Sequence, residues 1–169
     1  MKKKLSAKET KTLKIFHLLF SFMWLGGATA LAVISFFIRP DNPSEALIYA
    51  RILDFIDIWM IVVGAMGALF TGLIYSIWTN WGFYKHKWTL VKWIIVIIQI
   101  AYGTFILGPW VEHNIQIAET MSSNLSNYPV YFENLTKISI GGTIQLFFLV
   151  FIVYLSVIKP WKKNKTKKI

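Results

Sequence analysis

Side chains able to do chemistry interrupt the apolar stretches of this 169-residue chain. His17 lies a turn inside the first apolar stretch, and Lys92 lies near the start of the third. Tyr75 and Tyr154 lie about one turn before the ends of the second and fourth. An imidazole can ligate a metal or transfer a proton, and Trp24, seven residues after His17, falls on the same helix face. These five residues are the candidate cofactor-binding site, and Lys92 is the candidate catalytic group.

Four apolar segments must position those residues. The chain is 56% hydrophobic and 17% aromatic, which is more apolar surface than the few polar residues of a soluble domain this size could cover. A membrane-spanning helix needs about 20 mostly apolar residues. Four segments meet that need, and they define one integral membrane domain over residues 1–169. We predict an all-α fold, an antiparallel bundle of four transmembrane helices at 13–38, 55–79, 90–108 and 138–158.

The placement of charge predicts an orientation and a partner. Fifteen of the 18 Lys and Arg residues lie at the two ends and in the middle connection, while seven of the eight acids lie in the first and third connections. By the positive-inside rule both termini are cytoplasmic. The lysine clusters flank helix ends, where they can bind anionic lipid headgroups. We therefore expect a lipid bilayer and no nucleic acid as partner, and leave a homo-oligomer open.

Counting inward at about 1.5 Å per residue places His17, Tyr75, Lys92 and Tyr154 in one layer of the cytoplasmic half. Ionisable residues at such depth usually face the interior of a bundle. Each residue also has a structural interpretation. Lys92 can extend to the headgroups, the two tyrosines can belong to the interfacial aromatic belt, and His17 can share a hydrogen bond with another helix. A second layer nearer the midplane is expected to hold Ser21, Thr71 and Gln99, with Thr143 and Gln145 lying further out.

A weaker candidate lies on the outer side. Glu112 and His113 are adjacent, and with Asp54 or Asp57 they would supply the carboxylates and imidazole that suit zinc or copper. The two aspartates are one turn apart at the predicted start of the second span, where they also suit the helix dipole. The third connection runs to about 29 residues, and part of it is expected to form a short helix on the outer surface.

Three motifs carry a resemblance to known proteins: "LKIFHLLFSFMWLGG", "WGFYKHKWTLVKW" and "KPWKK". Nearly the whole chain resembles a family of small bacterial four-helix integral membrane proteins of unknown function. The pattern from His17 to Trp24, with Lys92 at the start of the third span, is also similar to the copper resistance protein D (CopD) group and to HemJ-type protoporphyrinogen oxidases. The resemblance implies a multi-pass protein of the bacterial inner membrane.

The HemJ-type resemblance implies a b-type haem, with His17 and Lys92 at the matching first-helix and third-helix positions. The second and fourth spans contain no histidine, so two histidines cannot ligate a haem within the bilayer. A haem held by His17 alone stays open, with a Met, Lys92 or nothing on its other face. Two functions follow from these residues. One is redox work on a haem or porphyrin. The alternative is a non-enzymatic transporter, metal-handling or assembly factor in which His17 and Lys92 are structural.

Overall fold

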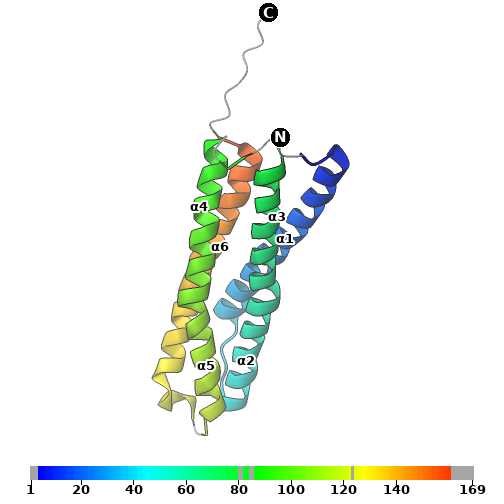
Figure 1. Ribbon diagram of the computed structural model, residues 1–169. Coiled ribbons are helices and arrows are strands. Elements are labelled where there is room, and N and C mark those ends of the chain that lie inside the picture. Colours follow the sequence, from blue (N-terminus) through cyan, green and yellow to red (C-terminus); the bar gives the residue numbers. More distant parts are fainter. Residues whose placement is uncertain (1–3, 80–81, 84–85, 123, 161–169) are drawn as a thin grey trace, which may run out of the picture.

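Four long helices make up the computed structural model, which describes residues 4–79, 82–83, 86–122 and 124–160 (Figure 1). The lysines at positions 2, 3 and 85 and from 162 onward lie outside the described residues. The four helices Ala7–Phe37, Pro43–Trp78, Lys87–Thr120 and Pro129–Ile158 are each long and apolar enough to cross a membrane. The predicted all-α bundle of four long helices is therefore confirmed.

Two of the long helices contain π-helical segments. The first helix is α1 (Ala7–Phe37). The second runs through α2 (Pro43–Ile56), the π-helical η1 (Asp57–Val62) and α3 (Val63–Trp78). The third runs through α4 (Lys87–Tyr102), the π-helical η2 (Gly103–Leu107) and α5 (Gly108–Thr120). A 3-10 turn, η3 (Leu125–Asn127), precedes the fourth helix, α6 (Pro129–Ile158).

Local sequence accounts for where the first two helices begin. Ser6 and Glu9 form a capping box, in which the Ser6 hydroxyl accepts from the Glu9 N–H and the Glu9 carboxylate accepts from the Ser6 N–H. Asn42 caps α2 by accepting from the Glu45 N–H at 3.0 Å, and Pro43 follows at the first helical position. Residues 38–42 therefore form a short link, and the second helix begins a dozen residues before the predicted span.

The third connection differs from the prediction. Helix α5 continues the third long helix to Thr120 and α6 begins at Pro129, so only residues 121–128 connect them. The expected surface helix is instead part of this continuous helix, because Val111, Asn114 and Ala118 bury one face of it. The helix Lys87–Thr120 has 34 residues, about 50 Å at 1.5 Å each. It is longer than the hydrocarbon core of about 30 Å, so α5 extends beyond it.

Two hydrophobic clusters divide the bundle along its length. The cluster at mid-bundle joins Trp24, Ala28, Ala65, Ala68 and Leu149 from α1, α3 and α6. The second lies at the end of the bundle formed by α2, α5 and the start of α6 (Figure 1). We call this second group the outer cluster, and its buried members are Ala46, Tyr49, Leu53, Ala118, Leu125, Tyr131 and Leu135. Large exposed side chains such as Phe22, Phe105 and Phe147 cover the sides of the bundle, as lipid contact requires.

Both ends of the described chain lie at the same end of the bundle, since the Leu5 N–H donates to the Trp78 carbonyl at 3.0 Å and α6 ends beside α4 (Figure 1). The positive-inside rule predicts that this end is cytoplasmic. Reporter fusions at Met1 and Ile169 should therefore be active only inside the cell. A fusion inserted at Ser126, in the opposite connection, is the matched control and should be active only outside. An external reporter at either terminus would overturn the predicted orientation.

Candidate functional site

His17 is bonded to a threonine on another helix. Its Nδ1 lies 2.8 Å from the Thr71 hydroxyl, which also lies 2.6 Å from the Gly67 carbonyl one turn earlier in α3. A hydroxyl has one proton, and a threonine in a helix commonly donates it to the carbonyl four residues earlier. Its oxygen then accepts from an Nδ1–H. That arrangement selects the tautomer in which Nε2 is unprotonated and free to ligate a metal.

Aromatic rings surround the imidazole. The Tyr75 ring meets it edge to face, with centroids 6.0 Å apart, and the Tyr75 hydroxyl donates to the Thr10 carbonyl of α1. A Cβ at Gly72 would lie 3.7 Å from His17 Cε1 and 3.8 Å from the Trp93 indole of α4. Gly72 of α3 therefore lies beside both His17 of α1 and Trp93 of α4, and the three helices meet at His17.

The other predicted members of this site lie at different distances from His17. Lys92 is close enough for its charge to act on His17, but its ammonium lies over the Trp88 ring, 5.5 Å from the centroid. Trp24 is buried in the mid-bundle cluster, and its backbone lies beside Gly64 of α3. Tyr154 is 53% exposed and stacks on Phe151. The structure therefore brings Tyr75 to His17, places Lys92 nearby, and leaves Trp24 and Tyr154 apart from it.

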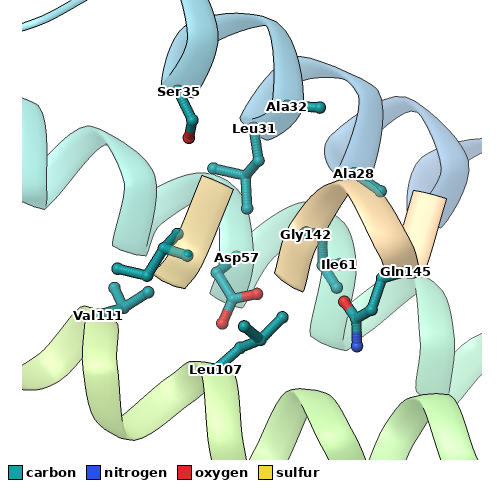
Figure 2. Close-up of a pocket in the computed structure, with 11 residues that line it drawn as sticks. Ala28, Leu31, Ala32, Ser35, Asp57, Ile61, Leu107, Val111, Gly142 and Gln145 are labelled. Carbon is teal, nitrogen blue, oxygen red and sulfur yellow. The ribbon is translucent and has the colours of Figure 1, made fainter. Parts of the chain in front are cut away.

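The outer candidates are not brought together. Glu112 and His113 are exposed on α5, and His113 Nδ1 lies 3.2 Å from the Asn134 amide. Asp57 instead lines a small cavity inside the bundle (Figure 2). Within the described ranges, no group of three or more His, Cys, Asp or Glu side chains is arranged to hold a metal ion.

Two buried glutamines join α4 to α6. The Gln99 side-chain amide donates to the Gln145 backbone carbonyl at 2.9 Å, and the Gln145 amide donates to the Gln99 backbone carbonyl at 3.0 Å. Each amide thus satisfies a polar group that would be costly to leave unpaired in an apolar interior. This reciprocal pair holds α4 against α6 at a level between His17 and Asp57.

Comparison with known proteins gives one family. The DUF2269 family, described as a predicted integral membrane protein, matches residues 11–160. The chain belongs to the DUF2269 family. No curated protein and no solved structure matches it. This DUF2269 protein is therefore a multi-pass integral membrane protein in contact with the lipid bilayer, as the resemblance to a four-helix family of unknown function implied. The similarity to the CopD and HemJ-type groups stays an expectation.

A haem would meet a suitable donor in this DUF2269 protein, but only one. The free Nε2 of His17 suits an axial position, and His86 and His113 lie at the start of α4 and in α5, away from it. The backbone of Gly72 and the Trp93 indole lie beside the imidazole. The Trp93 Nε1–H donates to the Ser76 hydroxyl at 3.2 Å, which fixes the ring between α3 and α4.

Thr71 and Ser76 are members of this site that the spacing did not assign to His17. Thr71 was expected in the next layer, because counting residues along each helix treats the four helices as parallel. In the DUF2269 protein α1 is tilted relative to the other helices (Figure 1), so equal counts do not mean equal heights. A threonine one turn before the tyrosine at position 75 was the available signal, since both then lie on one face of α3.

Proposed function

We propose that this DUF2269 protein binds one b-type haem, or a related porphyrin, in a redox role, with His17 Nε2 as the axial ligand. The 2.8 Å contact between His17 Nδ1 and the Thr71 hydroxyl carries the proposal. A second hydrogen bond of this kind accompanies nearly all metal-bound histidines, because it orients the ring and fixes its tautomer. The site lies toward the end of the bundle that carries both termini, which we predict to be cytoplasmic.

Each neighbour has a role toward the bound group. Thr71 holds the imidazole in place, and Gly72 adds no side chain next to it. Tyr75 and Trp93 supply aromatic surface that a flat macrocycle can contact. Lys92, whose described contact is the Trp88 ring, can pair with a propionate or a quinone oxygen. When bound, a b-type haem would supply one-electron chemistry, and its polar surroundings would tune the potential.

Absorption spectra of the detergent-purified protein test this proposal. The wild type should show a Soret band, His17→Ala should abolish it, and Lys92→Ala should shift or weaken it. Thr71→Val keeps the shape of the side chain but removes the hydroxyl, and should lower haem affinity about 10–100-fold. His86→Ala is the matched control and should keep the wild-type spectrum. A colourless, folded preparation that takes up no hemin on reconstitution would rule the proposal out.

The second candidate is a non-enzymatic role, as a small transporter, metal-handling or assembly factor. The contact between His17 and Thr71 also supports this role, because a histidine of α1 bonded to α3 stabilises the bundle without any ligand. Such interhelical hydrogen bonds in membranes are worth about 1 kcal/mol. In this case His17→Ala would lower the free energy of unfolding by that amount and change no spectrum.

A further inference from the structure

Asp57 lies inside the bundle, on the first residue of the π-helical segment η1. Helix α2 begins 14 residues earlier at Pro43, so Asp57 is not at a helix N-terminus. Figure 2 shows its carboxylate directed into a cavity between α1, η1, the start of α5 and α6. The cavity has a volume of about 20 Å³ and is lined mainly by apolar side chains, with Ser35, Asp57 and Gln145 as its polar members.

Within the ranges that the structure describes, the carboxylate of Asp57 makes no hydrogen bond or ion pair. The side chains that α1, η2, α5 and α6 present to the cavity are uncharged, and the charged group that acts on Asp57 is another acid, Asp54 of α2. No cation along the cavity wall therefore compensates a negative charge, and a carboxylate in largely apolar surroundings is costly.

Binding of a proton neutralises the Asp57 carboxylate and needs less space than binding of a metal ion. A cavity of about 20 Å³ admits about one water molecule, whereas a bound metal cation requires several oxygen ligands. The Gln145 amide nitrogen is engaged with the Gln99 carbonyl, so its amide oxygen is the group left to accept a hydrogen bond. Ser35 supplies a hydroxyl from α1, which also interacts with the Tyr49 side chain. These groups suit a neutral carboxyl, which donates one hydrogen bond and accepts another.

The backbone around the cavity is irregular on two sides. Asp57 and Ile61 belong to η1, and Leu107 belongs to η2, so both π-helical segments found among the described residues border the same cavity. Single π-helical turns within α-helices occur frequently at functional sites. At the start of η2, a Cβ at Gly103 would lie 3.2 Å from the Gln145 amide nitrogen, so a larger residue there would crowd the Gln145 side chain.

We infer that Asp57, with Ser35 and Gln145, forms a buried proton-binding site at the outer boundary of the membrane-spanning part. Asp57 is 21 residues before the end of α3, or about 30 Å, which equals the thickness of the hydrocarbon core. The proton reaches a carboxylate oxygen from bulk water, through a water molecule that the cavity can admit, and returns to bulk water by the same route. The site is separate from His17, and its inference does not depend on the proposed haem.

Dicyclohexylcarbodiimide tests this site, because it reacts with a protonated carboxyl in apolar surroundings and leaves a stable acylurea adduct. The full chain in lipid vesicles should gain one adduct at neutral pH, mapped to Asp57 by peptide mass analysis and reduced at alkaline pH. Asp57→Asn should lose it. Asp54→Asn, one turn earlier on the same helix, is the matched control and should keep the adduct, although the adduct should fall off at a lower pH because a neighbouring negative charge is removed. His17→Ala should also keep it, which separates this test from that of the haem.

Infrared spectroscopy measures the protonation state of Asp57 directly, without requiring the carbodiimide to reach it. The wild type should show the C=O stretching band of a protonated carboxyl at neutral pH, and folded Asp57→Asn should lack it. Absence of that band from the wild type would overturn the inference, whatever the labelling. Protection from the carbodiimide by sodium chloride, but not by choline chloride, would also overturn it and indicate a metal cation site. An adduct mapped to Asp54 instead of Asp57 would also overturn the inference.

Discussion

Replacement of Tyr131 by alanine is expected to lower the free energy of unfolding by about 3–5 kcal/mol, the range for removing a large aromatic side chain from a core. Tyr131 is fully buried in the outer cluster, where it joins residues of α2, α5 and η3. Its hydroxyl donates to the Ala46 carbonyl at 3.1 Å, and its own carbonyl accepts from the Asn114 amide. Tyr131→Ala therefore opens a cavity and removes the side-chain donor to the buried Ala46 carbonyl.

Reversible unfolding in detergent, followed by circular dichroism, measures this effect. Tyr131→Phe should lose only the hydroxyl contact, about 1 kcal/mol. Tyr154→Ala is the matched control for removing a tyrosine from α6, and because Tyr154 is 53% exposed it should change stability by less than about 1 kcal/mol. Similar losses for Tyr131→Ala and Tyr154→Ala would show that the outer cluster does not contribute as its burial indicates.

The sequence predicted the four helices because long apolar segments have one stable form in a bilayer. It did not predict their full lengths. The outer parts of these helices are amphipathic rather than apolar, with Asn114 and Asn134 paired inside the bundle by a 3.0 Å hydrogen bond. A buried asparagine and an exposed one look the same in a sequence. The sequence therefore predicts that the segment from Glu112 to Thr120 belongs to the third connection, part of it as a surface helix, whereas it continues the third long helix.

The same limitation affected the candidate sites. His17 was identifiable because an imidazole within an apolar segment is unusual, whereas its partner Thr71 looks like any small residue of a span. Asp57 was assigned to a helix N-terminus because the preceding residues are only moderately apolar. Asn42 and Pro43 in fact start that helix much earlier. Which side chains share a level depends on helix tilt, and tilt follows from packing contacts that no single segment specifies.

Alanine at Gly64 is the second substitution with a large expected effect. A Cβ there would lie 2.6 Å from the Trp24 backbone nitrogen, 2.9 Å from the Phe20 carbonyl oxygen and 3.0 Å from Trp24 Cα. All three are backbone atoms of α1, so no side-chain rotation can relieve the clash. Helices α1 and α3 must move apart along the stretch where the mid-bundle cluster packs. Overpacking of this kind costs about 1–3 kcal/mol, and with a rigid neighbour we expect the upper end.

Gly142→Ala supplies the matched control, because a Cβ at Gly142 meets nothing within 4 Å. Both substitutions gain the same helix propensity, about 1 kcal/mol for Gly to Ala, so the difference between them measures the clash alone. Gly67→Ala gives an intermediate case. Its Cβ would contact the Phe20 ring, a side chain that can be removed, so Phe20→Ala should restore part of the loss in Gly67→Ala and nothing in Gly64→Ala. Unfolding midpoints that rank Gly64→Ala beside Gly142→Ala would contradict the close approach of α1 and α3.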